Sequence, residues 1–339
     1  MDAPELRVEA TRGELVESVH PVAAAVVDAG GRLLAASRDP DLVTWWRSAA
    51  KPFQALPVVE DGAADRFGFS DEELALVSAS HSSEPRHLEL IGRILEKVGI
   101  AEEALACGIH TPLAAAVAAA VARGAVVMTP RWSNCSGKHA GMLALAKHRG
   151  WPLAGYQSAG HPVQDRILAT VAEWTGAPCP EIRLALDGCT AVCFGLSLRR
   201  MALGYARLAA SEAPPARRVL GAMMAHPAVV AGAGRACTDL MLAWPGRVVA
   251  KIGADGIHCA ALPHTGWGIA LKVEDGDMRA SGVALLEVLR QLLARLAPGE
   301  AADFPSAALT AHACHPIRNT RGAVTGELRP AGALRFFDG

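Results

Sequence analysis

The most chemically suggestive residues are a serine and a lysine three positions apart, Ser48 and Lys51, in the only Ser-x-x-Lys of the chain. Positions three apart share a helix face, so the amine can approach the hydroxyl. Pro52 is tolerated only in a first helical turn, so a helix over 53–59 must begin near Ser48. The dipole and unpaired N–H groups there favour a neutral lysine and an oxyanion. The pattern predicts a serine nucleophile with a lysine base; the alternative is a plain helix start.

Two further short elements follow in an informative order. Ser80-His81-Ser82 comes after a predicted helix, and Lys251-Ile252-Gly253 lies on a predicted strand. Ser-x-x-Lys, then Ser-x-Ser, then Lys-x-Gly is the order of active-site elements in serine β-lactamases and penicillin-binding proteins. We therefore expect Ser80 and Lys251 to form a second Ser-Lys pair in the same cleft.

A third cluster, without a counterpart in β-lactamases, combines thiols with nitrogen donors. Cys135 and His139 are one turn apart at the start of a predicted helix, and Cys189 follows Asp187 in a second loop. Thiolate and nitrogen ligands suit zinc. From spacing alone, a zinc site and a set of inert buried cysteines both stay open.

The surrounding elements predict an α+β fold in a single domain spanning 1–339. Strands over about 6–40, with a turn at 28–31, and over about 247–275 indicate an antiparallel sheet built from both chain termini. Between them lies a helical region over about 48–230. Its expected helices, and one that follows the second group of strands, are 71–77, 85–99, 113–122, 136–148, 161–175, 214–225 and 282–297. A cleft is expected where the helical region joins the sheet.

Composition excludes several classes of protein. The 33 basic and 34 acidic residues leave a net charge of −1, which argues against nucleic acid as a partner. No apolar run approaches the roughly 20 residues of a membrane span, and no secretory signal is visible. The eight cysteines show no disulfide pattern, so we expect a cytoplasmic protein. Only six basic residues are lysines, and a lysine, unlike arginine, can lose its proton when buried.

Longer motifs extend these short elements. They are the blocks 47–57, 79–82, the segment Asn134-Cys135-Ser136-Gly137-Lys138-His139, 187–189, 251–256 and the tail pattern 319–330. Together they resemble a known family, the rhizobial-type (Rhizobium etli-like) L-asparaginases of the asparaginase II family, and the resemblance runs from Val16 to Pro330.

The resemblance implies hydrolysis of L-asparagine to L-aspartate and ammonia, on a serine β-lactamase/glutaminase-like fold and in a homodimer. Carried over by motif, Ser48 is the nucleophile, Lys51 its base, and Ser80 and Lys251 the second pair. The resemblance also implies one Zn²⁺ per subunit, bound by Cys135, Lys138, Cys189 and water. The nitrogen ligand of the zinc is therefore Lys138 according to the resemblance, whereas spacing alone favours His139.

The remaining candidates are expected to contact substrate. His139 and Asp187 would orient ligands or touch the substrate. His81 and Asn134 belong to the same motifs, and Arg47 could hold a carboxylate through two hydrogen bonds. Two other functions stay open: a β-lactamase or penicillin-binding-like acyl hydrolase, and a non-catalytic zinc or amino-acid-binding protein.

Overall fold

The computed structural model describes residues 5–337. The chain folds into two compact units, and each is described by itself. Unit 1 comprises residues 1–49, 196–210 and 239–339, and unit 2 comprises 50–195 and 211–238. The single domain over 1–339 stays a prediction, and its residues 1–4 and 338–339 lie outside the described part.

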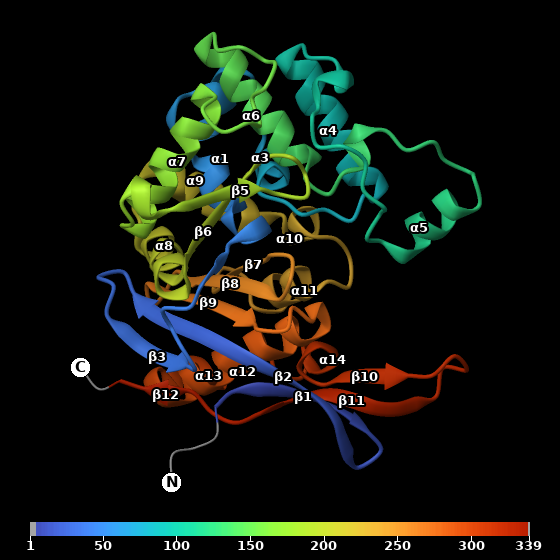
Figure 1. Cartoon of the computed structure of the whole chain (residues 1–339), viewed down its shortest axis with the longest axis vertical. Coiled ribbons are helices and arrows are strands. Elements are labelled where there is room, and N and C mark those ends of the chain that lie inside the picture. Colours follow the sequence, from blue (N-terminus) through green and yellow to red (C-terminus); the bar gives the residue numbers. More distant parts are fainter. Residues whose placement is uncertain (1–4, 338–339) are drawn as a thin grey trace. The chain divides into compact units, whose positions relative to one another are not determined.

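Unit 1 is built on an antiparallel sheet whose strands come from both ends of the chain (Figure 1). The strand order is β10-β11-β1-β2-β9-β8-β7, with β3 on β2 and β12 on β3. β1 pairs with β11 in the register Arg7↔Ala331. The bounds are β1 Arg7–Arg12, β2 Leu15–Asp28, β3 Leu33–Ser37, β7 Val249–Ile252, β8 Ile257–Leu262, β9 Trp267–Val273, β10 His315–Arg318, β11 Val324–Ala331 and β12 Arg335–Phe336. Short β4 (Val43–Trp45) also lies in this unit.

The predicted turn at 28–31 joins β2 to β3. The Asp28 carboxylate accepts the N–H groups of Gly30 and Arg32, both at 3.0 Å, and Gly31 has φ +89°. These are the local bonds and the left-handed residue of a tight turn. Helices α8 (Leu198–Ala210) and α12 (Met278–Leu296) pack on the sheet, and short α13 (Pro298–Ala302) and α14 (Thr310–Ala313) follow α12.

Unit 2 is mainly helical, and α6 (Ser136–Arg149) is its central helix, with eleven consecutive buried residues from Ser136 to Ala146. It contacts α1, α3, α4 and α7. The helices of this unit are α1 Lys51–Glu60, α2 Ala63–Arg66, α3 Asp71–Val77, α4 Pro85–Val98, α5 Ala115–Ala122, α7 Pro162–Thr175, α9 Pro214–Ala225 and α10 Pro227–Val230. Strands β5 (Arg183–Leu186) and β6 (Val192–Ser197) pair antiparallel, and β6 and α11 (Ala236–Ala243) cross the boundary between the units.

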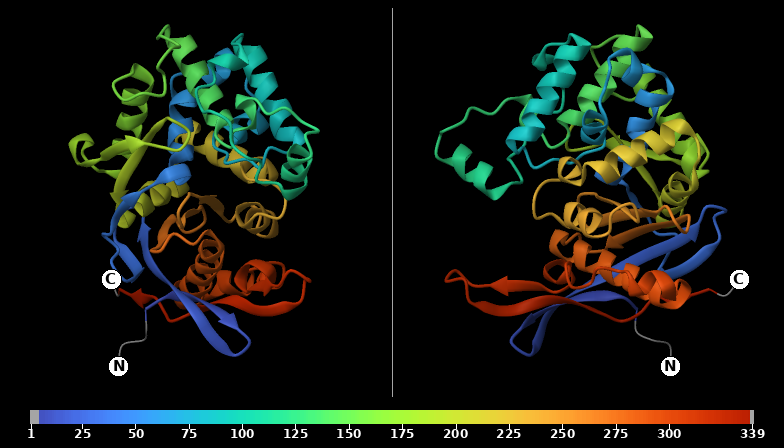
Figure 2. Two further views of the ribbon diagram at one scale, coloured as in Figure 1. Left: turned by 45° about the vertical axis from the view of Figure 1, so that its right-hand side comes forward. Right: turned by 180° about the vertical axis from the view of Figure 1, so that it is seen from behind.

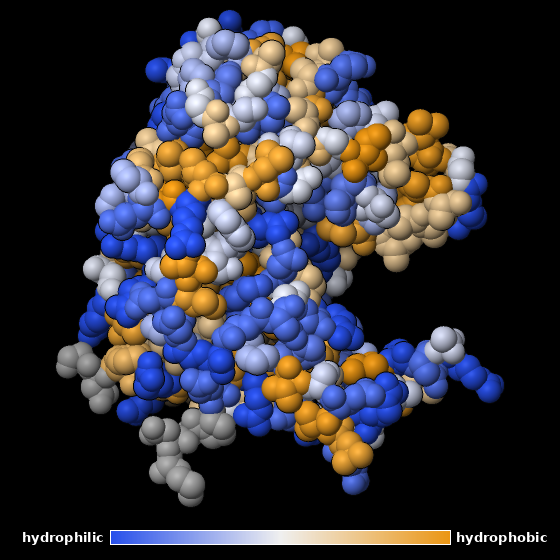
Figure 3. All heavy atoms as spheres, viewed as in Figure 1, coloured by the Kyte–Doolittle hydropathy of each residue, from blue (hydrophilic) through white to orange (hydrophobic). Residues whose placement is uncertain are grey.

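Short 3-10 turns complete the chain: η1 Arg47–Ala50, η2 Glu102–Ala104, η3 Pro130–Trp132 and η4 Cys179–Glu181. Helix α5 has no buried residue and stands apart from the other helices of unit 2 in both Figures 1 and 2. Its alanine and valine side chains give it an apolar surface (Figure 3). No helix within residues 5–337 has both the length and the hydropathy of a membrane span.

The α+β class and the antiparallel sheet from both termini are confirmed. All seven predicted helices are present, and α3 begins with a capping box between Ser70 and Glu73. Helix α8 and the pair β10–β11 were not predicted. Cys179 and Cys314 are exposed, and the other six cysteines are buried.

Candidate active site

Lys51 opens α1 and is completely buried. Every α1 residue except Glu60 is buried, including the polar Lys51 and Gln54. The Lys51 amine contacts three oxygens: the Ala79 carbonyl at 2.6 Å, the Ser80 hydroxyl at 2.9 Å and the Asn134 carbonyl at 3.3 Å. Two predicted catalytic residues of unit 2, Lys51 and Ser80, are therefore in direct contact.

Burial lowers the pKa of Lys51, and the nearby Lys138 ammonium lowers it further, against the Cys135 and Cys189 thiols. The Lys51 amine donates to the carbonyls of Ala79 and Asn134 and to the Ser80 hydroxyl, and the Cys135 side chain is a further hydrogen-bond partner. The lowered pKa makes this buried amine easier to deprotonate, which is the state in which a lysine acts as a base.

His81 is fully buried, and both its ring nitrogens are engaged within the protein. The Ser83 N–H donates to Nδ1 at 3.2 Å, so Nε2 carries the proton and donates to the Ser136 hydroxyl at 2.9 Å. Ser136 in turn donates to the Arg131 carbonyl at 2.9 Å. Burial, together with the neighbouring His87, Lys51 and Arg235 charges, holds the His81 pKa well below its usual value.

The three predicted zinc ligands lie together in unit 2, all buried. Cys135 is the residue before α6, Lys138 lies in its first turn, and Cys189 follows β5. Lys138 Nζ is 3.0 Å from Cys189 Sγ, and the two thiols share a hydrogen bond. The start of α6 and the loop after β5, some fifty residues apart in the chain, therefore meet in one cluster.

The cluster's charges are strongly coupled. The hydrogen bond from Cys135, with the Lys138 ammonium, lowers the Cys189 pKa to about 4 against the effect of burial. The same bond, with burial, raises the Cys135 pKa to about 12. Burial lowers the Lys138 pKa, but the Cys189 and Cys135 thiols outweigh it and raise the pKa. One thiolate and one ammonium therefore form a buried pair.

The donor set fits zinc once Cys135 and Lys138 have each lost a proton, because two thiolates and an amine nitrogen are then available, of which the Cys189 thiolate is already formed. Within residues 5–337 no three His, Cys, Asp or Glu side chains cluster as a metal site, and this set includes a lysine. Beside the cluster, His139 Nδ1 is 2.6 Å from the Tyr156 hydroxyl, while its buried Nε2 has no hydrogen-bond partner in the described chain. Such an orphaned buried nitrogen is costly, and a bound group would satisfy it.

Burial is the main cause that lowers the His139 pKa, to about 3, so the ring is neutral. Asp187 is half-buried, accepts the Gly188 N–H at 2.8 Å and raises the Lys138 pKa. The Asn134 backbone carbonyl accepts a hydrogen bond from the Lys51 amine. His139, Asp187 and Asn134 thus lie beside the Lys51–Ser80 pair or the Cys135–Lys138–Cys189 cluster.

The other three predicted site residues lie in unit 1. Ser48 is half-buried in η1, three residues before Lys51 in the chain. Lys251 is buried on β7 and its amine donates to the Ile252 carbonyl at 2.8 Å. Arg47 forms an ion pair with Asp255, so its charge is already compensated in the free protein.

Sequence reasoning passed over Arg235, which touches the site from a glycine-rich loop between α10 and α11. Its Nη1 donates to the carbonyls of Ser80 and Ala231. The run Ala231-Gly-Ala-Gly-Arg235 was the available signal, because paired glycines often mark a close approach of backbone to another segment.

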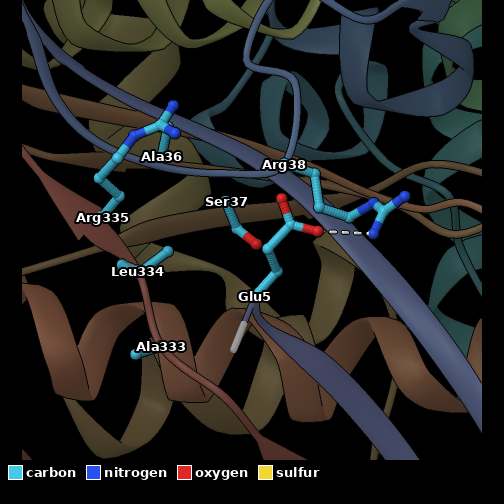
Figure 4. Close-up of a pocket in the computed structure, with 7 residues that line it drawn as sticks. All are labelled: Glu5, Ala36, Ser37, Arg38, Ala333, Leu334 and Arg335. Atoms are coloured by element: carbon cyan, nitrogen blue, oxygen red, sulfur yellow. Dashed lines mark hydrogen bonds and ion pairs between the residues drawn. The ribbon is translucent and has the colours of Figure 1, made fainter. Parts of the chain in front are cut away.

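A surface cavity of unit 1 contains none of the predicted residues. It has a volume of about 290 Å³ and is lined by Glu5, Ser37, Arg38 and Arg335, among others (Figure 4). Arg38 is ion-paired there with Glu5 at 2.8 Å and also with Glu274. The Glu5 and Arg38 charges of this cavity are therefore paired, and none of the predicted catalytic or metal-binding residues lines it.

Comparison with known proteins agrees with the motifs. No curated protein sequence matches the chain. Among solved structures, a putative β-lactamase from Bacteroides dorei is 14% identical, with a TM-score of 0.41 over 80% of this chain and 93% of the other. Mglu in its L-glutamate binding form is 18% identical, with a TM-score of 0.35 over 80% and 58%. The L-asparaginase II pattern matches residues 8–330, so the chain belongs to this family and is an amidohydrolase that acts on L-asparagine.

Proposed function

We propose that the protein hydrolyses L-asparagine through an ester on Ser48, with Lys51 as the base, in the manner of the rhizobial-type enzymes. The observation that carries this proposal is the Lys51 amine. It is fully buried, its pKa is lowered, and it lies 2.9 Å from the Ser80 hydroxyl. Ser48 lies in η1, three residues before Lys51, which is the first residue of α1.

In the first step the Ser48 hydroxyl attacks the side-chain amide carbon, and neutral Lys51 takes the hydroxyl proton. The C–N bond then breaks, and the leaving nitrogen takes a proton from the Lys51 ammonium and departs as ammonia. Water attacks the carbonyl of the β-aspartyl ester while Lys51 accepts a proton from it. The bond from this carbonyl to Ser48 Oγ then breaks, the Lys51 ammonium returns the proton to Ser48, and aspartate leaves. Ser80 and Lys251 would relay protons or hold the substrate amide during these steps.

Cys135, Lys138 and Cys189 are the residues that would hold a zinc ion. When bound, zinc would supply a positive charge that orients an anionic or amine group of the substrate. Cys189 is ready as a thiolate, whereas Lys138 and Cys135 must each release a proton on binding. Asp187 and His139 would steady this cluster, and His81 would act by holding the Ser80–Ser83 segment.

Trapping the β-aspartyl ester tests whether Ser48 is the nucleophile. Wild-type protein is mixed with L-asparagine, quenched in acid within one turnover and digested, and the peptide carrying the β-aspartyl mass is identified. We expect the adduct on the Ser48 peptide, no adduct and no ammonia from Ser48→Ala, and unchanged thermal unfolding of that variant. An ester on Ser80, or ammonia release by Ser48→Ala, would overturn the assignment.

A cytoplasmic homodimer is part of the proposal. No disulfide joins any of the eight cysteines, all of which lie in the described chain, and this suits a reducing compartment. In unit 1, Leu15, Val16, Val19 and Val324 are exposed apolar side chains on the long strands of the sheet. Such a patch is typical of an interface, and sedimentation at several protein concentrations would measure the assembly.

A further inference from the structure

The loop that carries Arg235 is pressed against the serine segment of the site. Gly232 has φ +135°, and a Cβ there would lie 2.5 Å from Ser82 Oγ and 2.9 Å from a Glu84 carboxylate oxygen. The Ser82 hydroxyl donates to the Ala231 carbonyl at 2.9 Å. Only glycine permits this approach, so the loop has a fixed position beside Ser80 to Glu84.

Arg235 is a partly buried cation without a carboxylate partner within residues 5–337. Its Nη1 donates to two backbone carbonyls, Ser80 and Ala231, while Nε and Nη2 make no hydrogen bond in the described chain. The nearest acidic group, Glu84, accepts the Ala233 N–H at 3.0 Å. The guanidinium is thus anchored by one nitrogen, and its other donors are available.

The position of this cation matches the substrate. Arg235 reaches the carbonyl of Ser80, and Lys51 reaches the hydroxyl of the same residue. The Lys51 amine and the Arg235 guanidinium are therefore separated by about the length of one residue, Ser80. A small molecule that reacts beside Lys51 would lie close to this guanidinium. L-Asparagine carries its α-carboxylate two carbons from the amide that reacts, and arginine binds carboxylates through paired hydrogen bonds.

We propose that Arg235 binds the α-carboxylate of L-asparagine and restricts the enzyme to free amino-acid amides. The inference rests on the proposed function of the site. Arg47, the carboxylate ligand that sequence suggested, is already paired with Asp255, whereas Arg235 forms no ion pair within the described residues and feels Glu84 only at longer range. An incoming carboxylate would supply the missing charge and use the available N–H donors.

The test compares substrates with and without that carboxylate. 3-Aminopropanamide has the amine and the amide of asparagine but lacks the carboxylate. The main variant is Arg235→Gln, which removes the charge of the side chain but keeps a shorter N–H donor beside the Ser80 and Ala231 carbonyls. We expect KM for L-asparagine to rise roughly 100-fold with kcat little changed, and kcat/KM for 3-aminopropanamide to stay within about 3-fold.

Further measurements separate binding from folding. The products L-aspartate and β-alanine differ by the same carboxylate; as inhibitors, only L-aspartate should weaken in Arg235→Gln. Arg235→Lys should recover part of the KM, and guanidinium chloride at millimolar concentration should partly rescue Arg235→Ala. Arg93→Ala, which removes a surface partner of Glu89, is the matched control and should behave as wild type.

The outcomes are distinct. If Arg235→Gln weakens both substrates and both inhibitors equally, Arg235 only supports Ser80, and the inference is wrong. If L-aspartate inhibits the variant as strongly as the wild type, the inference is also wrong. If wild-type protein releases no ammonia from L-asparagine, the proposed function fails, whereas L-aspartate binding still tests Arg235.

Discussion

Strained residues lie next to the chemically important ones. Among residues 5–337, five non-glycine residues have positive φ, and four of them flank site motifs: Arg47, Ser83, Thr190 and Asp255. Positive φ is most costly for a β-branched residue such as Thr190. Its hydroxyl donates to the Ala106 carbonyl at 2.6 Å, which holds the loop that presents Cys189. Strain of this kind persists where surrounding bonds fix a functional position.

At the same scale, the lysine of the proposed zinc set can be tested against a lysine on the same helix. Lys138→Met keeps an unbranched side chain that is one atom shorter, and it removes the nitrogen ligand. We expect zinc affinity to fall at least tenfold, because two thiols alone bind zinc more weakly. Metal content after dialysis against a zinc buffer measures this.

The control is Lys147→Met, since Lys147 is exposed on α6 and donates only to the Gly99 carbonyl. It should retain zinc as the wild type does. Full zinc occupancy in Lys138→Met would remove Lys138 from the ligand set, and in that case His139, with its orphaned Nε2, becomes the nitrogen to test.

At the scale of elements, the position of Lys138 depends on how closely α6 packs on α3. A Cβ on Gly137 would lie 2.2 Å from the Leu76 carbonyl oxygen, a distance that no packing tolerates. A Cβ on Gly141 would lie 2.6 Å from Val77. These two glycines, one turn apart, set the depth at which the first turn of α6 holds Lys138 against its partners.

Gly137→Ala therefore should push α6 away from α3. We expect a loss of stability of about 3 kcal/mol and reduced zinc binding, since overpacking forces backbone shifts. Gly221→Ala on α9 is the matched control, because no described atom lies within 4 Å of its added Cβ. This control should be neutral or stabilising by up to about 1 kcal/mol. Urea unfolding of both variants checks the pair, and equal stabilities would contradict the packing argument.

Local signals explain which elements the sequence could predict. Helix α3 has its capping box, α4 has Pro85 at its start and Gly99 at its end, and the β2–β3 turn has Asp28 and Gly31. Helix α8 has no such signals and follows β6 directly, so its sequence shows no boundary. Strand β11 is recognisable only by its pairing with β1, more than 300 residues away in the chain.

The same reasoning explains the candidate site. Motifs led to Lys51, Ser80, Cys135, Lys138 and Cys189, and the structure brings these together within unit 2. Arg235 was missed because its role depends on hydrogen bonds to backbone carbonyls, which leave no pattern in side-chain types. Spacing also favoured His139 as a ligand without showing that Tyr156 occupies one of its nitrogens.

At the scale of the whole molecule, we expect stability in acid to depend on buried neutral histidines, which include His81 and His87 as well as His139. His81 and His87 stack with ring centroids 5.2 Å apart. His87 accepts the Glu84 N–H on Nδ1 and donates from Nε2 to the Ala228 carbonyl, so a second proton would break its cap of α4. Burial is the main cause that lowers both pKa values below their usual range.

Because these pKa values are lowered in the folded protein, the unfolded chain binds more protons below pH 6.5 or so. Stability is therefore complete above that pH and falls as the pH decreases, by up to about 1.4 kcal/mol per pH unit for each histidine. His87→Gln keeps one acceptor and one donor but cannot titrate, so its stability should fall less steeply. Urea unfolding at pH 7.5 and 5.5, with metal chelated, measures the slope. His264→Gln, at an exposed position, should match the wild type, and a His87→Gln slope equal to theirs would show that His87 does not contribute.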